Sequence, residues 1–168
     1  MYTFARKMCF LIAALITVTS AWLPQAAAQE LVFKCGATIE SNVSTSITES
    51  QVTSTTFVRL HDTKFVVTLG TVGDCAVVLF TAQTACKGTS SNDTCYIRAL
   101  DNGVPMRPTA PGGAVFDSES QTPSAHSLAW VIRGPLQGTH NFTIEVRVGK
   151  AGTTFVIDNL TIHVQLFS

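Results

Sequence analysis

The sequence predicts an all-β protein, an antiparallel β-sandwich or jelly roll of about eight or nine strands that follows a cleaved signal peptide. Three observations predict this class. Apolar and polar residues alternate with a period of two in the carboxyl-terminal half, as in strands with one buried and one solvated face. Short runs rich in β-branched residues are separated by Gly, Pro, Asn or Asp, and no later segment carries an amphipathic helical stripe.

Residues 1–28 have the layout of a signal peptide. Arg6 and Lys7 precede an apolar run, Cys9–Leu23, and the small residues Ala26–Ala28 provide a cleavage site. This run of about 15 residues is shorter than the roughly 20 that span hydrocarbon, so we expect cleavage and not a membrane anchor. No later run is longer, and we therefore expect a secreted or periplasmic product with no membrane span in the mature chain.

Composition limits the function of the remaining residues 29–168, which we expect to form a single domain. Cleavage would leave 140 of the 168 residues and remove two of the 11 cationic side chains, giving a formal charge of −2. Such a chain lacks the basic surface that nucleic-acid binding requires. The 46% hydrophobic content of the full sequence also argues against an intrinsically disordered protein.

Four cysteines follow the signal peptide: Cys35, Cys75, Cys86 and Cys95. An even number in an exported chain predicts two disulfides, and sequence leaves three pairings open. We favour Cys86 with Cys95, because residues 87–94 are polar and turn-like, which leaves Cys35 for Cys75. The sequence contains no C-x-x-C pair, which would favour a zinc site. We therefore expect neither a metal nor another cofactor.

The expected strands, in chain order, are Leu31–Phe33, Phe57–Leu60, Lys64–Leu69, Cys75–Phe80, Cys95–Leu100, Ser127–Arg133, Asn141–Val148 and Leu160–Leu166. The β-branched runs Lys64–Leu69 and Cys75–Phe80 are expected to be central strands that are buried on both faces. Asn141–Val148 and Leu160–Leu166 alternate without a break, which predicts one buried and one solvated face.

Two stretches depart from this pattern. Residues 37–56 are rich in Ser and Thr, which is typical of a flexible stalk or of an exposed edge strand. Residues 101–126 form a long Pro/Gly loop, which is either a binding loop or a surface crossover with Ala114–Phe116 as a short edge strand. If the loop binds a ligand, the candidate residues are Asn102, Arg107, Asp117 and Glu119.

Several short motifs resemble a known group. They are Cys75–Ala82, Ile97–Pro105, Ala129-Trp130, Gly138-Thr139-His140 and Gly152–Phe155. Over about residues 53–166 the chain is similar to uncharacterised secreted bacterial β-sandwich proteins in which a G-T-H turn precedes an alternating carboxyl-terminal strand. The resemblance implies the sandwich fold and no activity, and the Ser/Thr-rich segment and the Cys86 and Cys95 pair depart from the group.

Catalytic patterns are weak. Ser127 follows His126 at a strand start, where adjacent side chains point to opposite faces, and no G-x-S-x-G elbow is present. His61-Asp62 is interpreted as a polar turn, and His163 is expected to face solvent or a second subunit. A small secreted hydrolase with His126 or His140 as the base is the alternative function.

Four asparagines begin N-x-S/T triplets: Asn42, Asn92, Asn141 and Asn159. Threonine-rich strands generate such triplets by alternation, and we favour unmodified side chains over glycosylation. The sequence thus predicts an exported, non-enzymatic β-sandwich that binds a glycan, binds another protein or assembles with itself.

Overall fold

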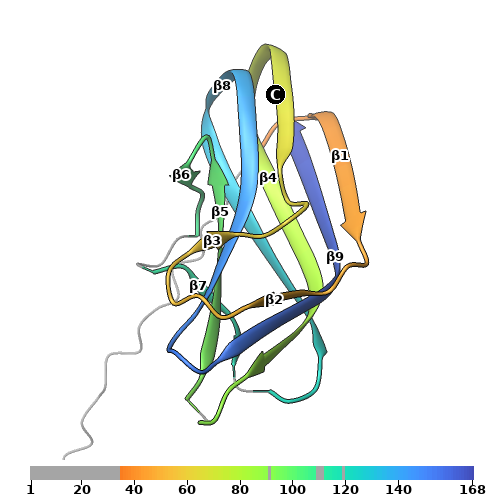
Figure 1. Cartoon of the computed structure of the whole chain (residues 1–168). Helices are drawn as coiled ribbons and strands as arrows, with labels where there is room; N and C mark the ends of the chain where they lie inside the picture. Colours follow the sequence, from red (N-terminus) through yellow and green to blue (C-terminus); the bar gives the residue numbers. More distant parts are fainter. Residues whose placement is uncertain (1–34, 91, 109–111, 119) are drawn as a thin grey trace, which may run out of the picture. The chain divides into compact units, whose positions relative to one another are not determined.

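The computed structural model describes residues 35–168 except 91, 109–111 and 119. The predicted signal peptide, the expected strand Leu31–Phe33 and Glu119 lie outside the described residues. The described residues form an all-β structure of antiparallel strands with no helix, which confirms the predicted fold class (Figure 1). No helix in this part of the chain has the length and apolarity to cross a membrane.

The sheet has nine strands. Six of them are hydrogen-bonded in the order β1-β9-β4-β8-β5-β6, and β2, β3 and β7 pair with β9, β8 and β5. Their bounds are β1 Thr38–Ser46, β2 Ser50–Val52, β3 Val58–Arg59, β4 Phe65–Lys87, β5 Thr94–Asp101, β6 Val104–Pro105, β7 Ala114–Ser118, β8 Ser124–Val148 and β9 Thr154–Phe167.

The two longest strands, β4 and β8, belong to both layers of the sandwich (Figure 1). Their pairing runs regularly from Phe65 to Leu69, shifts register between Leu69 and Cys75, and then continues to Thr84. After this shift, residues 75–87 of β4 pair with β9. At the other end of the β4–β8 pairing, residues 142–148 of β8 pair with β5, and residues 145–146 also pair with β3. One layer therefore contains β1, β2, β9 and the later part of β4, and the other contains β3, β5, β6 and β7.

The central region has fewer strands than expected because pairs of expected strands are joined into single long strands. The expected strands Lys64–Leu69 and Cys75–Phe80 are two parts of β4, and Ser127–Arg133 and Asn141–Val148 are two parts of β8. Glycines at positions 70, 73, 134 and 138 surround the bend, and these interrupt the β-branched pattern without ending the strand.

The core lies between the two layers. Its largest fully buried side chains include Trp130, Phe80, Phe142 and Phe155. The Phe116 ring of β7 lies 5.5 Å from that of Phe80 and 6.5 Å from that of Phe155, so β7 closes one side of the core. Trp130 is 1% exposed, in the anchoring position that its apolar neighbours in sequence predict.

The expectation that Lys64–Leu69 and Cys75–Phe80 are buried on both faces is wrong. Val66 is 55% exposed and Leu79 is 37% exposed, whereas Val67, Val78 and Phe80 are buried. Each run therefore alternates like an ordinary sandwich strand, and its outward β-branched residues stabilise extended backbone without being covered.

The two departing stretches lie at sheet edges. In residues 37–56, β1 and β2 pair with successive parts of β9. In residues 101–126, β6 and β7 pair with β5, and β7 contains the expected edge strand Ala114–Phe116. Asn102 and Gly103 have positive φ angles of 48° and 81°, as the tight turn between β5 and β6 requires.

Two disulfides join Cys35 to Cys75 and Cys86 to Cys95, the pairs that the spacing favours. Their Cα–Cα separations are 5.9 and 5.8 Å. The first attaches the chain before β1 to β4, and the second closes the connection between β4 and β5. Two such bridges are consistent with an oxidising compartment.

Candidate functional site

A segment that we name the crossing segment, residues 53–64, connects the two layers of the sandwich (Figure 1). It begins after β2, which pairs with β9, and it contains β3, which pairs with β8. The crossing segment therefore joins the edges of the two layers.

Phe57 anchors the middle of the crossing segment. The Arg98 guanidinium lies 4.0 Å from the centroid of the Phe57 ring, and that of Arg147 lies 5.2 Å from it. Arg98 also donates two hydrogen bonds to the Glu145 carboxylate. A Cβ atom on Gly113 would come within 2.6 Å of the Phe57 ring, so a glycine is needed for this close packing.

The crossing segment ends in a tight turn at His61 and Asp62. Leu60 is 2% exposed, and its N–H donates to the Ile144 carbonyl at 2.9 Å. The buried Thr63 hydroxyl donates to the Leu60 carbonyl at 2.6 Å. Asp62 has a φ of 57°, a left-handed conformation that Asp tolerates better than most residues. Buried contacts on both sides thus hold His61 and Asp62 exposed at the tip.

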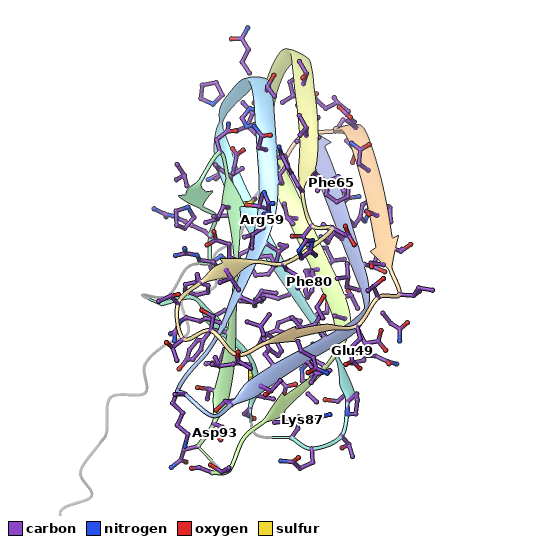
Figure 2. All side chains as sticks on the ribbon, viewed as in Figure 1. Glu49, Arg59, Phe65, Phe80, Lys87 and Asp93 are labelled. Carbon is purple, nitrogen blue, oxygen red and sulfur yellow. A yellow bond between two sulfur atoms is a disulfide. The ribbon has the colours of Figure 1, made fainter. Side chains whose placement is uncertain are left out.

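Three hollows adjoin this turn, and Arg59 and His61 line all of them. We name their union the Arg59–His61 groove. The first, of about 580 Å³, extends to the end of β1 at Ser44 and Ser46. The second, of about 400 Å³, extends along β2, and Figure 2 labels two of its lining residues, Arg59 and Glu49. The third, of about 440 Å³, extends over β5 and β8 to Glu145.

The side chains of the Arg59–His61 groove are polar and mixed in charge. Arg59, Lys64, Asp62 and Glu49 are all exposed, and their formal charges cancel. Within the described part of the chain, the side chains of Arg59, His61 and Asp62 form no hydrogen bond or ion pair. Their donors and acceptors are therefore free to bind a ligand, and hydroxyl groups from Ser and Thr supplement them.

The candidate residues from the 101–126 loop do not form one site. Asn102 donates to the Thr139 carbonyl and accepts from Asn141 beside the β5–β6 turn. Arg107 pairs through its backbone with Val131. Asp117 is 4% exposed and accepts a 2.7 Å hydrogen bond from Thr84. Glu119 lies outside the described residues.

His126 does not have the geometry of a catalytic triad. Its Nε2 lies 2.7 Å from the Ser124 hydroxyl and 3.7 Å from Asp117 Oδ2. A triad needs the serine and the carboxylate at opposite ring nitrogens, whereas both approach the same nitrogen here. Ser127 points to the other face and pairs with the Thr81 hydroxyl.

His140 lies in the protein interior. Its Nδ1 is 2.8 Å from Asp101 Oδ2, and the two side chains are 9% and 5% exposed. Among the described residues, its Nε2 is buried without a hydrogen-bond partner, and the ring stacks near Phe142. This pair therefore packs in the core, where a substrate has no direct access.

The asparagines of the N-x-S/T triplets are mostly engaged in hydrogen bonds. Asn42 donates to Glu40, Asn141 to Asn102, and Asn159 to Gln83 and Asp158. Asn92 is exposed in the connection between β4 and β5. Within the described residues, no group of three or more His, Cys, Asp or Glu side chains is arranged to hold a metal ion.

Comparisons with known proteins give no family. No family model matches the chain, and no curated protein matches it. One similar solved structure is described as "EclA C-terminal domain; sugar-binding protein", with a TM-score of 0.36, 16% identity, and coverage of 84% of this chain and 89% of that chain. Another, from infectious bursal disease virus, has a TM-score of 0.42 and 12% identity, and the match spans 84% of this chain but 35% of the viral chain.

Sequence reasoning missed Arg59 and treated His61-Asp62 only as a polar turn. The turn is present, but its importance comes from the three hollows that meet beside it. The available signal was the grouping of Arg59, His61 and Asp62 around one apolar residue, Leu60, just after the Ser/Thr-rich residues 37–56.

Proposed function

We propose that the protein is an exported, non-enzymatic binding module whose Arg59–His61 groove binds a neutral glycan. The observation that carries the proposal is the convergence of three hollows on two exposed side chains, Arg59 and His61, that are not engaged by the described protein. Their combined size is appropriate for a ligand of several sugar rings.

The chemistry of the groove favours a polyhydroxylated, uncharged ligand. Each sugar hydroxyl both donates and accepts hydrogen bonds, and the groove offers donors on Arg59 and Lys64 beside acceptors on Asp62 and Glu49. Charge-assisted hydrogen bonds to such groups are stronger than neutral ones. The balance of charge gives no preference for an anionic or a cationic ligand.

A rigid site supports a binding role. The turn is held by buried Leu60 and Thr63, and Phe57 fixes the preceding residues between two arginines. Preorganisation of this kind lowers the entropic cost of binding. Export is supported by the signal-like residues 1–28 and by the two disulfides.

A glycan array followed by calorimetric titration of the best neutral oligosaccharide tests the proposal. Arg59→Ala should weaken binding by about tenfold or more, which is the loss expected for one charge-assisted hydrogen bond. Arg107→Ala is the matched control, because Arg107 is also exposed but lies outside the groove, and it should leave affinity unchanged.

Failure of every neutral glycan to bind would contradict the proposal. Equal losses in Arg59→Ala and Arg107→Ala would show that the effect is not specific to the groove and would contradict the proposal as well. If chromatography shows that shortened sugars are released during the titration, the hydrolase alternative is favoured.

A further inference from the structure

β1 is an edge strand that carries little protection against pairing with another strand. It lies at the end of the strand order, and in the described structure it pairs only with β9. It has nine residues, TIESNVSTS, without proline or lysine, and its one register irregularity lies at its start, between Thr38 and Glu40. Edge strands of soluble proteins are usually short, bulged or charged, so this one is available for strand addition.

Exposed apolar side chains recur at every fourth residue along this edge. Ile39 is 41% exposed, Val43 is 60% exposed, and Ile47, directly after β1, is 85% exposed. Glu40 is the only charged residue of the strand. A spacing of four keeps one strand face, so Val43 and Ile47 belong to the outer face together with Ser41 and Thr45.

The three central rows of the outer face that β1 shares with its neighbours are uncharged. The register places Val43 beside His163, His163 beside Leu79, and Leu79 beside Ala129. The rows on either side continue the same face with Ser41, Gln165, Val77 and Val131, and with Thr45, Thr161, Thr81 and Ser127. None of these twelve residues is Asp, Glu, Lys or Arg, so these three rows bring no like charges together when an identical edge is placed next to them.

The strand is complementary to a second copy of itself. If two β1 strands run antiparallel with Val43 opposite Val43 of the second copy, then Ile39 lies opposite Ile47, and Ser41 opposite Thr45. Glu40 then faces Ser46, and no two like charges meet. A shift by two residues breaks this match, because Val43 then faces a serine or Thr45.

We propose that two copies of this protein associate through antiparallel pairing of their β1 strands about Val43. The layers that contain β1 in the two copies then form one continuous sheet across a two-fold axis, with their uncharged central rows on the same side. The partner is a second copy and not an unrelated peptide, because the apolar and polar matches all come from this chain's own residues. The pairing borders the Arg59–His61 groove, because Ser44, Thr45 and Ser46 line one end of it, but Val43, where the pairing is centred, does not line it.

Sedimentation velocity of the mature protein between about 1 and 100 µM tests the pairing. We expect a reversible dimer. Val43→Lys places two cations opposite each other and should raise the dimer dissociation constant by about tenfold or more. Val115→Lys is the control, since Val115 is 56% exposed on the edge strand β7 of the other layer, and it should leave the dimer intact.

A mixing experiment distinguishes loss of pairing from loss of folding. Val43→Lys and Val43→Glu should each dimerise more weakly than the wild type, and a mixture of the two should dimerise more tightly than either variant alone, because opposite charges then face each other across the axis. A wild-type protein that stays monomeric at about 100 µM would overturn the proposal. An unchanged dissociation constant in Val43→Lys, or a mixture that dimerises no more tightly than either variant alone, would overturn it as well.

Discussion

Removing the Thr63 hydroxyl should destabilise the protein measurably. Thr63 is 1% exposed, and its hydroxyl donates to the Leu60 carbonyl at 2.6 Å and accepts from the Ile144 N–H at 3.4 Å. Thr63→Val keeps the side-chain shape but leaves the Leu60 carbonyl without this donor. A net hydrogen bond contributes about 1 kcal/mol, and an unsatisfied buried group costs about 1–3 kcal/mol, so we expect a loss of about 2 kcal/mol.

Urea denaturation measures this loss, and calorimetry should show a Tm lower by about 6 °C for a domain of this size. Thr81→Val is the control, because the Thr81 hydroxyl is exposed and pairs only with Ser127 in the described structure. Its unfolding free energy should change by less than about 0.5 kcal/mol. If Thr63→Val changes stability no more than Thr81→Val does, the Thr63 hydrogen bonds do not hold the turn.

The loop closed by Cys86 and Cys95 supplies three further predictions. A Cβ atom on Gly88 would overlap the Asp93 carboxylate, so Gly88→Ala should lower the unfolding free energy by at least about 1 kcal/mol, and an unchanged urea midpoint would contradict this. The Lys150 hydrogen bond lowers the pKa of Asp93 below its ordinary value of 3.8. Because the pKa of Asp93 is lower in the folded protein, its contribution to stability is complete above pH 3.8 and is lost as pH falls through the folded pKa. Lys150→Met should therefore flatten the acid side of a Tm-against-pH curve. An unaltered curve would refute this role of Lys150. Replacing Cys86 and Cys95 with Ala opens a loop with a sequence separation of 9 and should cost about 2.5 kcal/mol; two or more free thiols in the unreduced wild type would show that the bridges do not form.

Much of the fold follows from local patterns. The alternation in Asn141–Val148 and Leu160–Leu166 predicts their strands because each buries every second residue. The continuity of β4 and β8 does not follow, since glycines inside a β-branched run normally mark an end. Here the partner strand bends at the same place, and pairing is kept through the bend.

The candidate site depends on long-range placement and could not be derived in the same way. Asp117 looks like a loop ligand in sequence, but β7 turns it inward to accept a hydrogen bond from Thr84. Arg59 and His61 look like ordinary polar residues, but the crossing segment places them where three hollows meet. The path of that segment depends on packing of Phe57 against Arg98 and Arg147, far away in the chain.

The most direct test of the central claim is titration of the ¹⁵N-labelled protein with a neutral oligosaccharide, followed by amide chemical shifts. Binding in the Arg59–His61 groove predicts that the largest shifts fall on residues 59–64 and on the adjoining residues 44–51. Saturation with shifts confined to the residues around Arg107, or no shifts at all, would contradict it.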